Sequence, residues 1–185
     1  MARSVANHKA LSGASKSAGR ALEALSDPQW AHIPREEVVA WAMAAVIHCD
    51  MCRLVVSLDE CEPGIASLLA MSDVVSKLYE IKRWYLGQGA KALRKIACTK
   101  SCGIPLVDER LRQLKSLHPI GSVDKYANYR NRLGYHYADD TVDHLVRFGE
   151  EESIHFYALL TTFVRFSGEW AKLTSAVLRD AAATS

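Results

Sequence analysis

Apolar residues recur at helical spacing along most of this chain, and most regularly near its C-terminal end. From Phe156 to Val177 the large apolar side chains follow one another at intervals of three or four residues, and Arg165 with Glu169 adds an i,i+4 charge pair. That spacing places the apolar side chains on one face of an α-helix. No segment alternates apolar and polar residues as a half-buried strand does. The sequence therefore predicts an all-α fold, an antiparallel helical bundle of about five to seven helices.

Proline, glycine and capping residues divide the chain into helical segments. Pro34, followed by Glu36 and Glu37, predicts a helix start, because carboxylates are favourable at the positive end of the helix dipole. Pro63 and Gly64 interrupt the pattern of that helix. The predicted helices cover 34–58, 68–96 in one or two pieces, 105–117, 123–133, 140–149 and 153–177. The residues expected to face inward in the segment 105–117 are Leu106, Leu111, Leu114 and Leu117.

The length and composition indicate one globular domain. A chain of 185 residues is long enough for one good core. We assign residues 1–30 to a loosely docked N-terminal helical arm, 31–181 to the helical bundle and 182–185 to a disordered tail. With 49% hydrophobic and 24% charged residues, the composition excludes collagen-like, disordered and disulfide-scaffold classes.

We expect a cytoplasmic protein with no membrane partner. No stretch approaches 18 uninterrupted apolar residues. The basic, serine-rich N-terminus lacks the apolar core of a secretory signal. Five cysteines, an odd count without regular spacing, fit reduced thiols better than a disulfide framework.

The cysteines leave a metal site open as an interpretation. Cys49 with Cys52, and Cys98 with Cys102, could supply four soft donors to a structural zinc ion. Alternatively, Cys49 and Cys52 lie three residues apart within a helical pattern and simply share a buried face. Helix-embedded pairs lack the turns that are usual at structural zinc, so the sequence favours no metal and no cofactor.

Positive charge is concentrated between Lys77 and Arg132. This segment carries 13 basic and 4 acidic residues, whereas the rest of the chain carries 10 basic and 17 acidic ones. Such a bias suits a polyanion such as nucleic acid, and a solvated helix face shows the same pattern. The candidate cations are Lys82, Arg83, Lys91, Arg94, Lys95, Lys100, Arg110, Arg112, Lys115, Arg130 and Arg132.

The segment from Tyr129 to Tyr137 has the densest chemistry in the chain. It holds two guanidiniums, an amide, an imidazole and three phenols in nine residues. Histidine serves as a general acid or base near neutral pH, and arginine offers a fork of donors to a phosphate whose charge grows in the transition state. This combination suits phosphodiester cleavage. A structural role, in which Arg130 and His136 bridge neighbouring helices, fits the same spacing.

Arg130, followed by the polar Asn131 and then by His136 after five intervening residues, resembles the motif of HEPN domains. These domains are all-α bundles that carry the motif late in the chain, with one more long helix behind it. The resemblance covers the few residues of the RNxxxYH motif and the helical architecture. It implies a metal-independent endoribonuclease that acts as a homodimer, with the motifs of two protomers meeting in one composite cleft. Many such proteins are toxins or defence effectors, so the resemblance also allows an antitoxin or regulatory protein as a partner.

The resemblance implies a role for each motif residue. His136 assists attack of the ribose 2′-hydroxyl on the adjacent phosphate, Arg130 stabilises the phosphorane and Asn131 orients the pair. The substrate would be RNA, since DNA lacks that hydroxyl. The candidate substrate-binding residues around the motif are Arg132, Tyr135 and Tyr137. The alternative is a non-catalytic helical dimerisation or scaffold module that binds a protein or RNA partner, as many HEPN domains are.

Helix geometry independently favours a dimer. Arg130 and His136 lie about 120° apart around one straight helix, so both cannot point at one atom. Either Gly134 ends the helix and turns His136 round, or a two-fold axis brings in the motif of a second copy. The remaining histidines have no nearby complement in the sequence and receive no role: His8, His32, His48, His118, His144 and His155.

Overall fold

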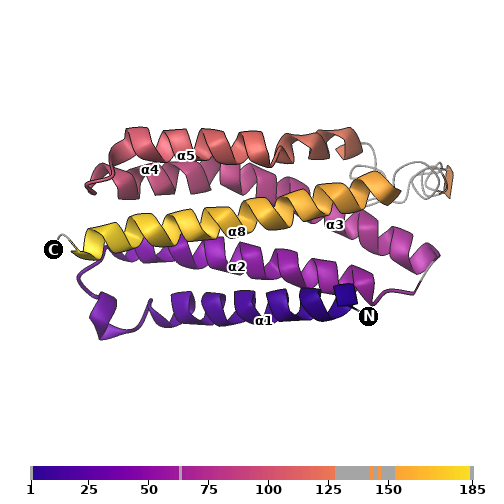
Figure 1. Ribbon diagram of the computed structural model, residues 1–185, viewed down its shortest axis with the longest axis horizontal. Coiled ribbons are helices and arrows are strands. Elements are labelled where there is room, and N and C mark those ends of the chain that lie inside the picture. The colour runs from indigo at the N-terminus through magenta and orange to yellow at the C-terminus, as the bar shows by residue number, and fades with distance from the viewer. Residues whose placement is uncertain (1, 63, 128–141, 144–145, 147–152, 184–185) are drawn as a thin grey trace.

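The structure, a computed structural model, describes residues 2–62, 64–127, 142–143, 146 and 153–183 (Figure 1). Within these ranges the chain forms six α-helices and no strand. The helices are α1 (Ala2–Glu23), α2 (Arg35–Asp59), α3 (Ile65–Trp84), α4 (Ala90–Cys98), α5 (Gly103–Leu117) and α8 (Ser153–Ala183). The short elements are the 3₁₀ helices η1 (Pro28–Trp30) and η3 (Ile120–Tyr126) and the π-helical turn η2 (Tyr85–Gly89).

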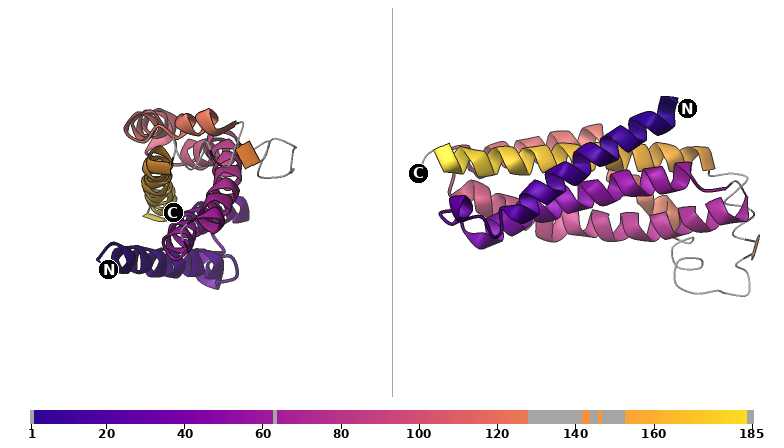
Figure 2. Two further views of the ribbon diagram at one scale, coloured as in Figure 1. Left: turned by 90° about the vertical axis from the view of Figure 1, so that its right-hand side faces the viewer. Right: turned by 90° about the horizontal axis from the view of Figure 1, so that it is seen from below.

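The rods of the bundle alternate in direction along the chain, with α3 and α4 counted as one rod (Figure 1). α3, η2 and α4 follow one another without a break and form one long rod. α5 lies on one side of the bundle and α1 on the opposite side, with α8 running between them (Figure 2). The all-α antiparallel bundle predicted from the sequence is confirmed.

The helix boundaries follow local chemistry. α2 begins directly after Pro34, with Glu36 and Glu37 in its first turn, as the sequence predicts. Gly64 precedes α3 with φ +105°, and Gly103 opens α5 with φ +64°. A residue with a Cβ rarely adopts such backbone angles, so these two glycines set the turns into α3 and α5.

α2 is the central helix, and it packs against α1, α3, α4 and α8. By length and composition alone it is apolar enough to span a membrane. Half of its most apolar window is buried inside the bundle, so the core accounts for much of that apolar character. On its outer face Val39, Met43 and Val46 are 39%, 40% and 37% exposed.

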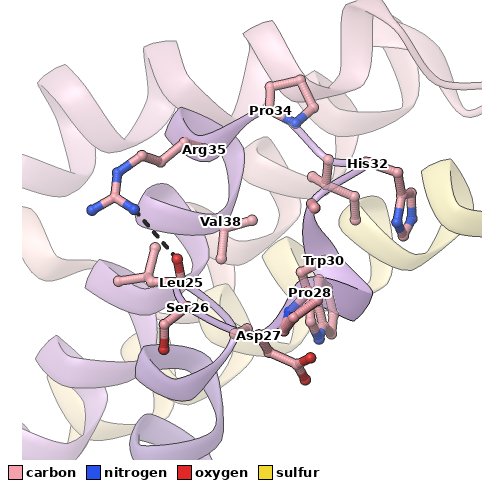
Figure 3. A pocket seen from close by; sticks show the side chains of 12 residues that line it. Leu25, Ser26, Asp27, Pro28, Trp30, His32, Pro34, Arg35 and Val38 are labelled. Carbon is pink, nitrogen blue, oxygen red and sulfur yellow. Dashed lines mark hydrogen bonds between the residues drawn. The ribbon is translucent and has the colours of Figure 1, made fainter.

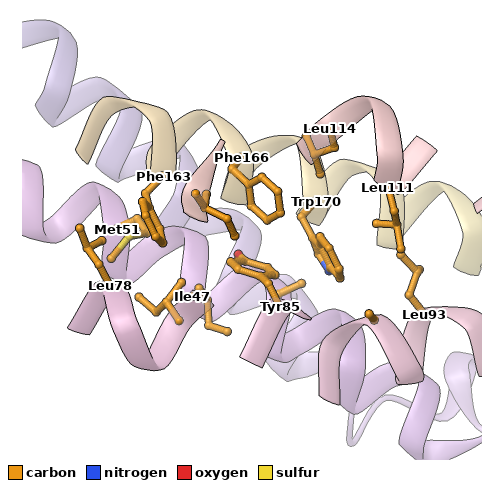
Figure 4. Close-up of a cluster of buried hydrophobic side chains, with 14 of the residues drawn as sticks. Ile47, Met51, Leu78, Tyr85, Leu93, Leu111, Leu114, Phe163, Phe166 and Trp170 are labelled. Carbon is orange, nitrogen blue, oxygen red and sulfur yellow. The ribbon is translucent and has the colours of Figure 1, made fainter. Parts of the chain in front are cut away.

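An aromatic cluster fills the centre of the bundle (Figure 4). Tyr85 from the π-turn and Phe166 and Trp170 from α8 are at most 1% exposed. Their ring centroids lie 4.8 to 5.7 Å apart at the tilted or edge-to-face angles that aromatic pairs prefer. Burial of one large apolar side chain contributes about 1.5–3 kcal/mol to the free energy of folding. This cluster therefore fixes α8 to the α3–α4 rod.

A buried ion pair joins the start of α2 to the turn between α4 and α5. Glu37 Oε2 lies 3.4 Å from Lys100 Nζ, and the two side chains are only 5% and 9% exposed. Removing one partner of a buried pair leaves an uncompensated charge, which typically costs about 3–5 kcal/mol. The pair therefore holds this turn against the first turn of α2.

The helix ends and the N-terminal segment differ from the sequence expectations. Residues 1–30, expected as a loosely docked arm, contain α1, whose Ala18 and Ala21 are buried against alanines of α2. η3 takes the place of the first turn of the helix predicted from Val123. α8 extends to Ala183 and so includes residues that the sequence assigns to the tail.

Two leucines of α5 do not face inward as predicted. Leu106 and Leu117 are 49% and 73% exposed, whereas Leu111 and Leu114 are buried. Val107 begins the buried face, and Leu106 points about 100° away from it around the helix. Leu117 is the last residue of α5, where the helix ends.

We expect Gly89→Ala to destabilise the protein by about 1–3 kcal/mol, as overpacking of a filled core does. A Cβ on Gly89 would lie 2.8 Å from the indole of Trp84, which is packed against Tyr85 and Trp170. Gly87→Ala is the matched control in the same π-turn, because nothing lies within 4 Å of its Cβ position. It should be neutral or stabilise by about 0.4–1 kcal/mol. Urea unfolding measures both, and equal stability of the two variants would contradict this packing.

Candidate functional site

The motif that the sequence singles out lies outside the described residues. This holds for the catalytic candidates Arg130, Asn131 and His136, and also for the substrate-binding candidates Arg132, Tyr135 and Tyr137.

The described residues that flank this segment meet inside the bundle. Tyr126, at the end of η3, and Phe156, in the first turn of α8, are 3% and 0% exposed. Their rings contact edge to face with centroids 6.2 Å apart. The described residues on either side of the motif-bearing segment, at the end of η3 and the start of α8, therefore lie side by side in the bundle.

Much of the basic segment predicted to bind a polyanion is neutralised in the fold. Six of its described cations form ion pairs: Lys77 with Asp50, Lys82 with Asp124, Arg94 with Asp108, Lys95 with Glu36, Lys100 with Glu37 and Arg112 with Glu109. Three of these carboxylates belong to α2, outside the segment. A charge count along the sequence therefore overstates the positive field of this region.

A different basic surface runs along α8. Arg165, Lys172 and Arg179 are exposed and follow one another at intervals of seven residues. Seven residues make nearly two turns, so these side chains share one face and lie about 10.5 Å apart along the axis. The core residues Phe163 and Trp170 keep the same interval two positions earlier, which places them about 200° away, on the opposite face.

Two hollows flank this face of α8. The first, about 680 Å³, lies between α8 and α5 and is lined by Arg110 and Arg165. The second, about 470 Å³, lies between α8 and α1 and is lined by Arg20 and Arg179. Lys172 lines both hollows, so we treat them as one depression and call it the α8 groove.

His48 of α2 lies at the junction of the two hollows. Its Nδ1 is 2.9 Å from Ser167 Oγ, which itself donates to the carbonyl of Val164 at 2.9 Å. A hydroxyl has one proton to donate, so His48 Nδ1 carries the hydrogen of its bond to Ser167. Nε2 is then the acceptor and faces Sγ of Cys52 at 3.9 Å. A Cβ on Gly168 would come within 3.1 Å of the imidazole, so the glycine makes room for the ring.

The floor of the groove is uncharged near neutral pH. Burial lowers the pKa of His48, and the positive charge of Lys172 lowers it further. Cys52 and Tyr85 line neither hollow, and burial in the core raises the pKa of the Cys52 thiol to about 11 and raises the pKa of Tyr85 as well. The positive charge of the groove therefore comes from the arginines and the lysine on its walls.

A tryptophan pair lines the α1 side of the groove. Trp30 and Trp41 stack with ring centroids 5.1 Å apart and an interplanar angle of 27°. The corner between α1 and α2 positions Trp30 (Figure 3). Asp27 caps η1 with its side chain, and Arg35 closes the corner by donating to the carbonyl of Leu25 at 3.3 Å.

The structure does not gather the cysteines into a metal site. Cys49 and Cys52 lie on α2, whereas Cys98 ends α4 and Cys102 precedes α5, and none of these four described cysteines forms a disulfide. In the part of the chain that the structure describes, no three His, Cys, Asp or Glu side chains are placed to hold a metal ion. The four thiols of the zinc interpretation therefore do not converge.

The α8 groove is the feature that sequence reasoning missed. His48 lies 119 positions from its partner Ser167, so nothing near it in the sequence marks it. The predicted pair of Arg165 with Glu169 is also replaced, because Glu169 Oε1 lies 2.8 Å from Lys172 Nζ. The interval of seven residues between the three cations of α8 can be seen in the sequence. That α1 and α5 lie beside them could not be predicted from it.

We expect His48 to make folding stability fall on the acid side of neutrality. Its pKa is lowered from 6.5 in the folded state, so below that pH the unfolded chain binds a proton that the folded chain does not. This contribution to stability is therefore complete above pH 6.5 and is lost as the pH falls toward the folded pKa.

The measurement is urea unfolding at about pH 7.5 and about pH 5.5. His48→Gln, which keeps an amide donor for Ser167, should lose less stability between the two pH values than the wild type. His155→Gln, at an exposed histidine of α8, is the matched control and should behave as the wild type. An equal pH dependence in the wild type and His48→Gln would show that His48 is not held neutral by the fold.

Comparison of the chain with protein-family models, with curated proteins and with solved structures finds no match in any of the three.

Proposed function

We propose that this chain is a HEPN-like, metal-independent endoribonuclease that acts as a homodimer. The observation that carries the proposal is the arrangement of Arg130, Asn131 and His136 in a chain that folds as an all-α antiparallel bundle. Support also comes from the contact between Tyr126 and Phe156, which holds the end of η3 against the start of α8, the described elements on either side of the motif. A role as a toxin or defence effector, restrained by an antitoxin or regulatory protein, belongs to the same proposal.

The chemistry of this function is a transesterification within RNA. His136 takes the proton of a ribose 2′-hydroxyl while the oxygen attacks the adjacent phosphorus. The bond from phosphorus to the 5′-oxygen of the next nucleotide breaks, and that oxygen leaves with a proton from an imidazolium. Arg130 stabilises the charge of the phosphorane, and Asn131 orients the pair. The products are a 2′,3′-cyclic phosphate end and a 5′-hydroxyl end.

The purified protein should cleave a mixed RNA pool in excess EDTA and leave 2′,3′-cyclic phosphate ends. Arg130→Ala and His136→Ala should each cleave about 10²–10⁴-fold more slowly, because each removes one catalytic group. Both should melt within about one or two degrees of the wild type. The matched controls are Arg83→Ala and His155→Ala, at exposed residues of the same types, and they should cleave as the wild type does.

A different outcome would favour the alternative function. If the wild type leaves the RNA intact and His136→Ala lowers the melting temperature by several degrees, the motif is structural. The chain is then a non-catalytic dimerisation or scaffold module.

Mixing the two inactive variants tests whether the site is composite. If each site takes Arg130 from one protomer and His136 from the other, a heterodimer of Arg130→Ala with His136→Ala has one intact site of its two. Random exchange of subunits should then restore roughly a quarter of the wild-type rate, since about half of the dimers are mixed. No recovery after subunit exchange, confirmed by light scattering of an exchanging dimer, would place both groups in one protomer.

A further inference from the structure

We propose that the α8 groove binds single-stranded RNA, with phosphates on the cations of α8 and of the groove walls and a base on the Trp30–Trp41 pair. The choice of RNA rests on the proposed ribonuclease function. The surface itself is independent of the RNxxxYH motif, because α1, α2, α5 and α8 build it from described residues.

The cations of the groove are available to a polyanion. Arg165 makes no ion pair with another residue of the described part of the chain. Arg20 and Arg179 each use only Nε in a bond to a backbone carbonyl of their own helix, so their terminal nitrogens are open. Lys172 pairs with Glu169 in an exposed contact, and such pairs contribute little and exchange readily.

Carboxylates are scarce on the walls of the groove. Among the side chains that the structure describes, the hollow beside α1 is lined by Arg20, Lys172 and Arg179 and by no carboxylate. Glu169 is the one carboxylate that lines the hollow beside α5. A concave surface with charges of one sign concentrates the field and attracts a polyanion.

The tryptophan pair favours a single-stranded nucleic acid over other polyanions. Trp30 and Trp41 are half-buried and line the same hollow as Arg20 and Arg179. Single-stranded nucleic acids are recognised by this combination, in which cations hold phosphates and an aromatic ring stacks on a base. A lipid surface offers no ring to stack. Hollows of 470 and 680 Å³ hold roughly one or two nucleotides each, which suits a single strand and not a duplex.

α8 connects the groove to the segment that carries the motif. α8 begins at Ser153, sixteen residues after Tyr137, and Arg165 follows twelve residues later, about 18 Å along the helix axis. A strand held along α8 in the direction of Ser153 reaches the end of the bundle where Tyr126 and Phe156 meet.

The test is equilibrium binding of fluorescent oligo(U) to the His136→Ala chain, which is not expected to cleave it. For a single strand, the logarithm of the binding constant falls with the logarithm of the salt concentration by about 0.7 per phosphate contact. Arg165→Gln, Lys172→Gln and Arg179→Gln should each reduce this slope by about 0.7. Lys9→Gln and Lys125→Gln, at exposed cations that line neither hollow, are the matched controls and should leave it unchanged.

The stacking role of Trp30 is tested in the same assay. Trp30→Leu should weaken binding roughly tenfold and leave the salt slope unchanged, because it removes a stacking surface and no charge. Trp30→Phe keeps a ring and should recover most of the affinity. Melting curves confirm that each variant is folded before its binding is compared.

Several outcomes would overturn the proposal. One is an equal change in salt slope for the groove and the control substitutions. Another is binding of the protein to phosphatidylglycerol vesicles without binding to oligo(U). The cleavage assay separates this result from the proposed function. If the wild type does not cleave RNA but the groove substitutions still lower the salt slope, the proposed ribonuclease function is wrong and RNA binding by the groove is supported. If the wild type cleaves RNA but the groove substitutions leave the salt slope of binding unchanged, only the proposal of RNA binding by the groove is wrong.

Discussion

The packing of the aromatic face of α8 against α2 and the α3–α4 rod is the contact on which the rest of the structure depends. Phe163, Phe166 and Trp170 are buried in it, and the π-turn brings Tyr85 against them. Because an α-helix is rigid, fixing this face also fixes the opposite one, which carries the row of cations. The same packing brings Ser167 within 2.9 Å of His48 and so sets the floor of the groove.

The fold was predictable because its information is local and periodic. The three-and-four spacing of α8, the proline start of α2 and the glycines before α3 and α5 are each readable within one segment. The sequence predictions that differ from the structure concern contacts that are set by tertiary packing. α1 docks through alanines, whose spacing gives little apolar signal, and Leu106 lies one position away from the face that α5 buries.

The two candidate sites also differ in how much of each can be recognised from the sequence alone. The RNxxxYH motif is compact in sequence, so its residues and their chemistry can be recognised without a structure. The α8 groove combines residues from Arg20 to Arg179, which only the topology brings together. The charge distribution shows the same contrast, because six cations of the segment rich in lysine and arginine are paired with carboxylates, some of them, such as Glu36, on other helices.

The arrangement of charge argues that the groove cations serve something other than folding. Several lysines and arginines elsewhere in the described chain pair with carboxylates of other elements, as Lys82 does with Asp124 and Arg94 with Asp108. Along α8, exposed cations repeat on one face with little compensation, and such like charges repel one another and weaken the compact state. A bound phosphate backbone would remove that repulsion, since each phosphate carries the counter-charge that this face lacks. This repulsion is the physical argument for the polyanionic ligand proposed for the groove.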